Sequence, residues 1–403
     1  MSTTGIDPEL ISDCIHCGFC LPTCPTYGPL WQEEMDSPRG RIYLMGGLVD
    51  GSIPLTATTV EHFDRCLGCM ACVTSCPSGV QYDRLIEQTR DYIEQNFERE
   101  PADAALRRLI FSVFPHPRRM RAALALPRPR LPGKLGTLAD IAPPRRWLTN
   151  AAPPERTRAQ GERRARVGLL LGCVQRVLFG EVNAATARVL AAEGCDVEAP
   201  QAQECCGALH LHAGRREEGY RRARALGKRF AEAGVDALVV NAAGCGSHLK
   251  EAELPVRVLD VAELLAELGP EAERHPLPLR VAFQDSCHLA HAQRVRAEPR
   301  AALAAIPELE LLEPAEQAIC CGSAGIYNLV KPGPARELGD RKAGYVLALE
   351  PDVYASANPG CLVQVSAAMR RAGRALPALH PIELVDASIR GVPAPQVVAD
   401  ARR

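Results

Sequence analysis

The second half of the chain alternates short apolar runs with amphipathic segments. Residues 166–171 and 236–241 have the composition of buried strands, and residues 196–199 predict another strand. Between these runs, residues 183–193 and 219–233 carry apolar side chains at helical spacing. Strands that alternate with helices in this order predict a parallel sheet covered by helices, so we expect an α/β fold for this half.

The first part of the chain has a helical pattern instead. Ser37 and Pro38 predict the start of one helix, and residues 82–97 predict a longer, amphipathic one. Residues 115–166 are rich in Pro, Arg and Ala, and their prolines interrupt any long helix. We therefore expect a domain boundary in this stretch.

A basic segment overlaps that boundary. Between Asp103 and Asp140 the chain has eight Lys or Arg residues and no acidic residue. Such a segment is either a solvated linker or a surface that meets an anionic membrane or an acidic partner. The prolines disrupt the helix that a membrane anchor would need, which favours the linker.

Length and composition narrow the class of protein. The 403 residues predict two or three domains, with 47 basic residues against 48 acidic ones. This balance and the aromatic content of 4% give no sign of nucleic-acid binding. The N-terminus lacks a signal-peptide pattern, and no apolar run approaches the roughly 18 residues that span a bilayer. We expect a cytoplasmic protein, at most peripheral on the inner face of the cell membrane.

The 17 cysteines are the unusual feature of the composition. A chain of this size without an export signal is not expected to rely on disulfides, so thiolate ligands in a reducing cytoplasm are the better interpretation. The first eight cysteines form two runs with the same spacing, C-x2-C-x2-C-x3-C-P, which is typical of ferredoxins with two [4Fe–4S] clusters. The runs are Cys14, Cys17, Cys20 and Cys24, then Cys66, Cys69, Cys72 and Cys76.

In this motif the fourth cysteine of each run ligates the other cluster. The spacing therefore predicts Cys14, Cys17, Cys20 and Cys76 for cluster 1, and Cys66, Cys69, Cys72 and Cys24 for cluster 2. A pair of structural zinc sites is the alternative. Zinc ribbons need only two C-x2-C pairs, however, and have no use for a third cysteine followed by Cys-Pro.

The remaining cysteines repeat at an interval of about 115 residues. The first set is Cys173, Cys205, Cys206 and Cys245, and the second is Cys287, Cys320, Cys321 and Cys361. Gly207 and Gly322 follow the paired cysteines and permit a turn that aims both sulfurs at one centre. Each set is a possible third or fourth metal site for an iron–sulfur cluster or zinc, or a redox-active dithiol. Buried, unligated thiols are the remaining alternative, which suits Cys195.

These patterns predict four parts. An N-terminal helical, ferredoxin-like domain with two [4Fe–4S] clusters spans residues 1–114, and a Pro/Arg-rich linker spans residues 115–165. Two repeated α/β cysteine-rich units, which we call CCG units after their Cys-Cys-Gly motif, span residues 166–279 and 280–403. The fold class is therefore mixed α+β and α/β.

Two ferredoxin runs followed by two C…CCG…C units resemble the heterodisulfide-reductase-like, cysteine-rich CCG-domain iron–sulfur proteins. Residues 14–27, 36–44, 76–80 and 320–325 are most similar to the iron–sulfur subunits of bacterial glycolate oxidases. The resemblance implies a hetero-oligomer in which FAD-binding subunits oxidise glycolate to glyoxylate. The iron–sulfur subunit would relay electrons to a membrane acceptor such as a quinone pool. We find no G-x-G-x-x-G after a strand and no P-loop, so FAD is expected only on partner subunits.

Other functions fit the same cysteines. The chain could be the equivalent subunit of a lactate or glycerol-3-phosphate dehydrogenase, a thiol–disulfide oxidoreductase, or a zinc-stabilised scaffold. Many CCG domains end in C-x2-C, whereas His248 and Gln364 stand at the last position here. Four cysteines per unit still allow an ordinary cluster. His248 is either a further ligand or a residue on a helix surface.

Overall fold

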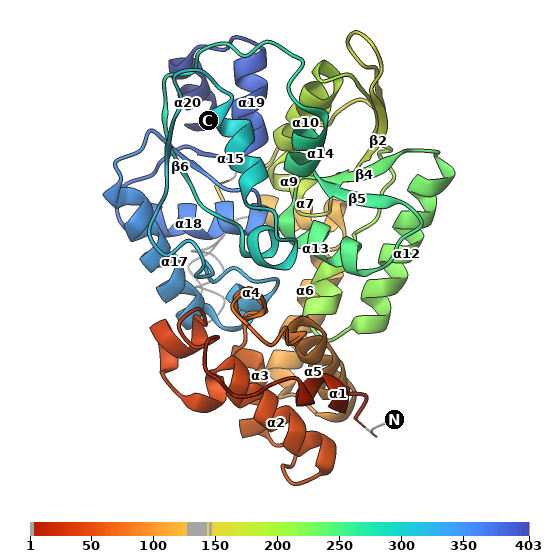
Figure 1. Ribbon diagram of the computed structural model, residues 1–403, viewed down its shortest axis with the longest axis vertical. Coiled ribbons are helices and arrows are strands. Elements are labelled where there is room, and N and C mark those ends of the chain that lie inside the picture. The colour runs from red at the N-terminus through yellow and green to blue at the C-terminus, as the bar shows by residue number, and fades with distance from the viewer. Residues whose placement is uncertain (1–3, 127–142, 145–146, 403) are drawn as a thin grey trace.

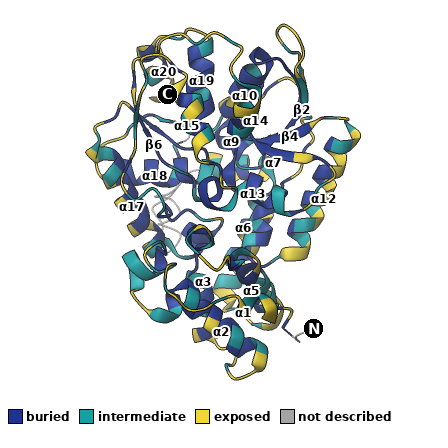
Figure 2. Ribbon diagram, viewed as in Figure 1, coloured by how far each residue is buried: buried dark blue, intermediate teal, exposed yellow. Residues whose placement is uncertain are grey.

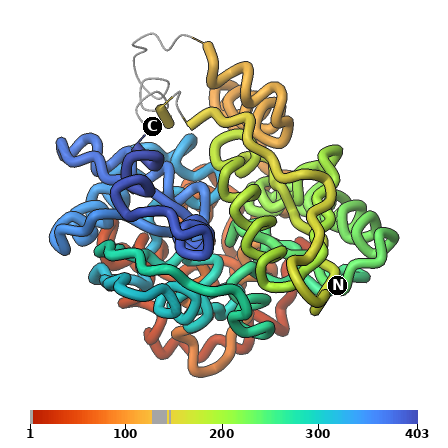
Figure 3. Tube along the Cα trace, turned by 90° about the horizontal axis from the view of Figure 1, so that it is seen from above, coloured from red at the N-terminus to blue at the C-terminus, as the bar shows by residue number. Residues whose placement is uncertain are grey.

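The computed structural model describes residues 4–126, 143–144 and 147–402. The N-terminal module lies at one end of the molecule, and the two CCG units stand side by side above it (Figure 1). The view from above shows the first unit and the second unit as neighbours around a shared centre (Figure 3). The central strands of both units are mostly buried, and many exposed residues lie on outer loops and helix faces (Figure 2).

The described part of the N-terminal module is helical, as its pattern predicts. Helix α2 begins at Pro38, where the Ser37 side chain accepts a hydrogen bond from the Gly40 amide at 3.0 Å and caps the helix. Met45 and Phe63 are fully buried in the core of the module. The elements are α1 (Pro8–Ser12), η1 (Thr26–Trp31), η2 (Glu34–Asp36), α2 (Pro38–Asp50), α3 (Ala57–Arg65), α4 (Ala71–Thr74) and α5 (Tyr82–Asn96).

The first CCG unit contains a five-stranded sheet in the order β1-β3-β2-β4-β5. All neighbouring pairs are parallel except β1 with β3. The three strands predicted from the sequence are present within one or two residues of the expected bounds. The strands are β1 (Arg156–Thr157), β2 (Ala165–Leu169), β3 (Cys195–Glu198), β4 (Ala237–Val240) and β5 (Arg257–Asp260). The helices are α9 (Gln175–Leu178), α10 (Gly180–Ala192), α11 (Ala208–His212), α12 (Arg216–Glu232), α13 (Ala243–Glu251) and α14 (Val261–Leu268).

The second CCG unit repeats this arrangement without the antiparallel edge strand. Its parallel sheet has the order β7-β6-β8-β9, which corresponds to β3-β2-β4-β5 of the first unit. The strands are β6 (Arg280–Phe283), β7 (Glu310–Leu312), β8 (Val353–Ala355) and β9 (Ala378–Leu379). The helices are η4 (His288–Ala292), α15 (Ala297–Ala304), α16 (Tyr327–Val330), α17 (Pro332–Ala348), α18 (Pro359–Arg371), α19 (Pro381–Ile389) and α20 (Ala394–Arg402).

The two units share one hydrophobic core. Helices of one unit pack against helices of the other. Helix α10 of the first unit packs on α19 of the second, and α15 of the second packs on α14 of the first. An ion pair between Arg188 and Asp386, at 2.7 Å, joins α10 to α19. The loops after β4 and β8 meet where the Ala243 amide donates to the Ala357 carbonyl at 3.2 Å. The repeat therefore places equivalent loops of both units at one interface.

Two helices, α6 (Pro101–Val113) and α7 (Pro117–Ala125), cover this interface from the basic segment. Pro117 stands at the start of α7, where a proline is tolerated because its missing N–H needs no partner. Ile110 packs in one buried cluster with Ala213 of the first unit and Val330 of the second. The expected breaks at residues 127–130 and 145–146 lie outside the described residues. None of the described helices has the length and apolar composition that crossing a bilayer requires.

Candidate functional site

The predicted ligands of cluster 1 lie around one small pocket. Cys14, Cys17, Cys20 and Cys76 all line it, together with Cys72. The loop folds back on itself at Gly18, whose φ of +86° is a left-handed conformation that favours glycine. Cys17 is exposed, and two large apolar side chains next to it, Ile15 and Phe19, are 70% and 67% exposed. This end of the module therefore presents the first thiol set at the protein surface.

The predicted ligands of cluster 2 lie deeper. Cys24, Cys66, Cys69 and Cys72 are all buried, and the thiols of Cys69 and Cys72 interact electrostatically with Cys24 from the other run. Burial raises the pKa of Cys69 and of Cys72 well above the ordinary thiol value. Thiols with raised pKa values stay protonated, so these cysteines must release their protons when they bind a metal. The chain therefore brings together the set that the crossed spacing predicts.

A buried cation lies beside this second set. Burial opposes the charge on Arg41, but the thiols of Cys66 and Cys24, the Tyr82 hydroxyl and Asp36 hold the pKa of its guanidinium above the ordinary arginine value. Hydrogen bonds fix its position. The guanidinium donates to the Thr26 hydroxyl at 3.0 Å and to the His62 carbonyl at 2.6 Å. A fixed positive charge stabilises negative charge on neighbouring sulfurs.

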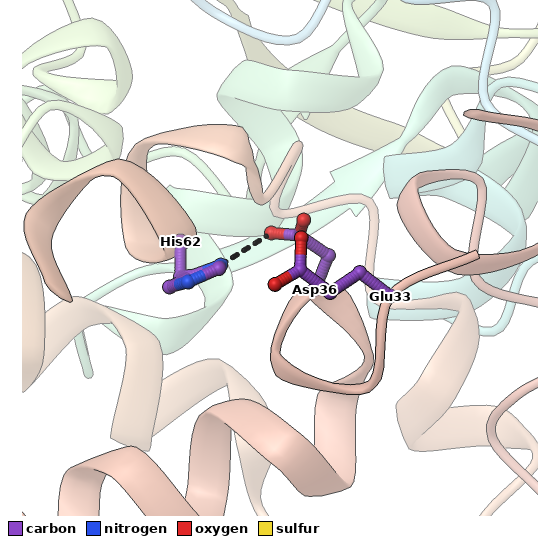
Figure 4. Close-up of side chains that lie close together, drawn as sticks. All are labelled: Glu33, Asp36 and His62. Carbon is purple, nitrogen blue, oxygen red and sulfur yellow. Dashed lines mark hydrogen bonds and ion pairs between the residues drawn. The ribbon is translucent and has the colours of Figure 1, made fainter. Parts of the chain in front are cut away.

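The Asp36 carboxylate beneath Arg41 also lies near Glu33 and His62, as Figure 4 shows. The ligand atoms of these three residues are close enough to hold a metal ion. However, the Asp36 carboxylate already accepts hydrogen bonds from Arg65 at 2.6 Å and from Arg41 at 3.3 Å. It also pairs with His62, at 3.1 Å. Since two guanidinium groups already occupy the carboxylate, the group is an ion-pair network rather than a cation site.

The eight cysteines of the CCG units line a single cavity of about 470 Å³ between the two units. Within the first unit, the sulfurs of Cys173 and Cys205 are 3.4 Å apart. Within the second unit, Cys287 and Cys320 are 3.9 Å apart, and Cys321 and Cys361 are 3.5 Å apart. In each unit the paired cysteines lie in a loop, whereas Cys245 and Cys361 lie in the first turns of α13 and α18. All these thiols are at the carboxyl end of the sheet, where open α/β sheets place their sites.

The glycine of each CCG motif shapes the turn that carries the paired cysteines. Gly207 has a φ of +98°, and a Cβ there would stand 2.3 Å from the Gly219 carbonyl oxygen. Gly322 has a φ of +86°, and a Cβ there would stand 2.6 Å from the Ala335 carbonyl oxygen. Both positions therefore exclude a side chain. Four converging sulfurs per unit are a donor set that suits an iron–sulfur cluster or zinc.

The two positions that depart from C-x2-C do not join the thiols in the cavity. His248 is fully buried, and its Nε2 is 3.1 Å from the Gly219 carbonyl oxygen, so the expectation of a helix-surface histidine is wrong. The Gln364 amide donates to the Ala335 carbonyl at 2.7 Å and accepts from Asn328 at 3.2 Å. Both side chains therefore tie their helix to the backbone that follows the CCG turn.

Two histidines in the cavity were not predicted from the sequence. The rings of His212 and His288 lie 4.8 Å apart, and both residues line the cavity. Burial lowers the pKa of His288 to about 4 and that of His212 well below its ordinary value. His212 follows the CCG motif of the first unit, whereas His288 follows the first cysteine of the second. Because they do not occupy repeated positions, the spacing gave no signal of their meeting.

Comparison with known proteins agrees with this organisation. The 4Fe-4S dicluster domain family matches residues 10–80, and the cysteine-rich domain family (CCG) matches residues 167–250 and 281–366. The chain is 35% identical to the probable glycolate oxidase iron-sulfur subunit of Bacillus subtilis (strain 168), over 91% of both chains. It is 36% identical to the glycolate oxidase iron-sulfur subunit of Escherichia coli (strain K12), over 94% of this chain and 95% of that one.

A solved structure shares the fold. The crystal structure of a hypothetical protein from Helicobacter pylori superimposes with a TM-score of 0.56 at 10% identity, over 90% of this chain and 69% of that one. The dicluster match and the thiol sets indicate iron–sulfur clusters, as the cysteine spacing predicts. With a 4Fe-4S dicluster domain followed by two cysteine-rich domains, the chain belongs to the family of the glycolate oxidase iron–sulfur subunits.

Proposed function

We propose that this chain is the electron-transfer subunit of a flavin-dependent glycolate oxidase. Partner subunits would bind FAD and oxidise glycolate to glyoxylate, and this chain would relay the electrons to a membrane acceptor. The observation that carries the proposal is the pairing of an exposed thiol set with a buried one in the N-terminal module. Two sets at different depths suit passage of electrons from a partner on the surface to the interior.

The residues that would hold the two [4Fe–4S] clusters are the eight N-terminal cysteines in the crossed arrangement. When bound, such clusters supply one-electron transfer. Cys14, Cys17, Cys20 and Cys76 would form the set that faces the flavoprotein, because Cys17 is exposed and Ile15 and Phe19 offer apolar contact area beside it. Arg41 would favour the reduced state of the deeper set, since its charge offsets added negative charge.

The CCG cavity does not suit glycolate itself, which supports placing glycolate oxidation on a partner. Glycolate is a carboxylate, and sites for carboxylates normally offer Arg, Lys or several backbone N–H donors. Among the described residues that line the cavity, none is Arg, Lys, Asp or Glu. A buried carboxylate without a cation would pay a large desolvation cost.

The test uses the anaerobically reconstituted complex with its flavin subunits. In a complex that contains Cys14→Ala, we expect glycolate still to reduce the flavin, while electron delivery to an external acceptor is lost. Stopped-flow absorbance follows the flavin, and a dye assay follows delivery. If Cys14→Ala stopped flavin reduction in an intact complex, the proposed division of labour would be wrong.

A further inference from the structure

Lys342 is a buried cation beside the thiol set of the second CCG unit. It lies in α17 and is only 1% exposed. Its side chain interacts electrostatically with the thiols of Cys321, Cys320 and Cys361. Helix α17 packs on α18, whose first turn carries Cys361. The lysine therefore lies close to the cysteines of the CCG turn and to the one that α18 contributes.

The charge of Lys342 has no carboxylate partner among the described residues. Its Nζ donates to the backbone carbonyl of Glu316, in the loop before the CCG turn, whereas the Glu316 carboxylate pairs with the exposed Arg341. A buried charge without an anion is strongly disfavoured. Burial accordingly lowers the pKa of Lys342, and the neighbouring thiols oppose this effect. Those thiols become anionic when they bind a metal, which would supply the missing negative charge.

An apolar residue occupies the equivalent position of the first unit. The carbonyls of Gly219 and Ala335 each lie against the glycine of a CCG motif, which sets α12 and α17 in register. The same count onward from these two residues leads to Leu226 in the first unit and to Lys342 in the second. Leu226 is 4% exposed in an apolar cluster, so the repeated fold does not require a lysine at this position.

The cation near the first thiol set is placed differently. Arg176 interacts electrostatically with Cys173, but it is only partly buried. Its guanidinium donates to the carbonyls of Gly172 at 2.8 Å and Gln201 at 2.9 Å. Solvent screens a partly exposed charge much more than a buried one. A fully buried cation is therefore a feature of the second set and not of the first.

We propose that Lys342 is the counter-charge of a metal centre bound by the second thiol set, Cys287, Cys320, Cys321 and Cys361. Its ammonium group stabilises the negative charge of the bound thiolates and raises the reduction potential of the centre, because reduction adds further negative charge. A cation in the low-dielectric interior acts more strongly on such a centre than one at the surface. Lys342 acts through the thiols and is a positioning residue. This role goes beyond the electron relay of the N-terminal module.

An EPR-monitored redox titration of the anaerobically reconstituted full chain tests this role. Cys321→Ala first identifies the centre of the second unit, because this variant should lose one signal and contain less iron. Lys342→Gln keeps a hydrogen-bond donor for the Glu316 carbonyl but removes the charge, so it should lower the potential of the identified signal. Lys342→Arg keeps the charge and should restore the potential.

Arg341→Gln is the matched control. Arg341 precedes Lys342 in α17 and is exposed, so this variant makes the same change of charge on the solvent side of the same helix. The potential of the second-unit signal should stay as in the wild type. An equal fall in Arg341→Gln and Lys342→Gln would show that the position of the charge does not matter, which contradicts the proposed role.

Thermal unfolding gives a second test that does not depend on measuring a potential. In the reconstituted wild-type background, Lys342→Met should lower Tm, because the anionic centre loses its counter-charge. In the Cys321→Ala background, which lacks the centre, Lys342→Met should leave Tm unchanged or raise it, because it removes a buried cation that has no anion. A lysine that only ties α17 to the Glu316 carbonyl would lower Tm equally in both backgrounds.

Several results would overturn the inference. If Cys321→Ala contained as much iron as the wild type, Lys342 would have no centre to balance. An unchanged potential in Lys342→Gln, a potential in Lys342→Arg as low as in Lys342→Gln, or an equal loss of Tm in both backgrounds would also contradict it. None of these measurements uses glycolate, so the inference stands or falls independently of the proposed substrate.

Discussion

Cys69 of the N-terminal module and Cys320 of the second CCG unit lie in one buried cluster, although the residues are far apart in the sequence. The two thiols are close enough that Cys320 contributes to the raised pKa of Cys69, after the larger effect of burial. The N-terminal module therefore meets the second unit beside the cavity. It also contacts the first unit, where the Arg90 guanidinium donates to the carbonyl of His212 at 2.9 Å.

The crossed arrangement of the N-terminal ligands makes a spectroscopic prediction. Cys24→Ala and Cys66→Ala should remove the same EPR signal, although the residues belong to different runs. Cys14→Ala and Cys76→Ala should each remove the second EPR signal, that of cluster 1. Since each cluster needs four thiolates, loss of any one ligand affects its own centre first.

Cys195 provides a control for these variants. It lies fully buried in β3, outside both sets of repeated cysteines and outside the residues that line the cavity. Cys195→Ala should leave iron, sulfide and both EPR signals unchanged. If Cys24→Ala and Cys14→Ala removed the same signal instead, the ligands would be grouped by run and the crossed assignment would be wrong.

Arg41 is expected to affect both stability and reduction potential. Arg41→Gln removes a buried cation and leaves the Asp36 carboxylate with fewer partners, which should cost about 3–5 kcal/mol in the free energy of unfolding. It should also lower the potential of the cluster beside Cys24 and Cys66, because reduction adds negative charge there. Denaturant unfolding and an EPR-monitored redox titration measure the two effects.

The double variant Asp36→Asn/Arg41→Gln removes both members of this ion pair. It should recover part of the lost stability, since no uncompensated carboxylate remains, and it should bring the potential part of the way back, since a negative charge is removed as well. A potential unchanged by Arg41→Gln would show that the guanidinium charge does not act on the cluster.

Gly322 should be intolerant of a side chain. Gly322→Ala forces a Cβ to within 2.6 Å of the Ala335 carbonyl oxygen at a φ of +86°, so we expect a loss of about 2 kcal/mol or more. The turn that aims Cys320 and Cys321 should be displaced as well. Gly333→Ala is the matched control in the same unit, because its Cβ meets nothing within 4 Å. Thermal unfolding of the two variants compares them, and equal stability would contradict the role of the turn.

His380 makes the second CCG unit sensitive to acid. It caps α19, where its Nδ1 accepts from the Ile382 amide at 3.1 Å, and burial lowers its pKa to about 3. The unfolded chain has a histidine pKa of about 6.5, so it binds a proton first as the pH falls. Stability is therefore lost between about pH 6.5 and pH 3, and this residue should account for about 1 kcal/mol at pH 5.5.

His380→Asn tests this pH dependence. Asparagine is a good N-cap and does not titrate, so the variant should lose less stability than the wild type between pH 7.5 and pH 5.5. Urea unfolding at each pH measures the difference. If the free energy of unfolding changed with pH in the same way for both proteins, His380 would not take up a proton on unfolding.

Sequence spacing predicted the parts of the molecule that depend on local chemistry. The crossed grouping of Cys24 with Cys66 follows from a motif with a fixed ligation rule, and the strands around Cys173 and Cys245 follow from apolar periodicity. The meeting of all eight CCG thiols in one cavity did not follow, because it depends on packing of α10 against α19 across the repeat. The buried position of His248 was not predicted for the same reason, because its partner, Gly219, belongs to a different helix.

The central claim is that the eight N-terminal cysteines hold two [4Fe–4S] clusters. Anaerobic analysis of iron and acid-labile sulfide, with EPR of the reduced protein, tests it most directly. The account predicts a brown protein with about eight irons and eight sulfides per chain for the N-terminal module, and more if the CCG units also bind clusters. A colourless protein that contains zinc and no inorganic sulfide would contradict it.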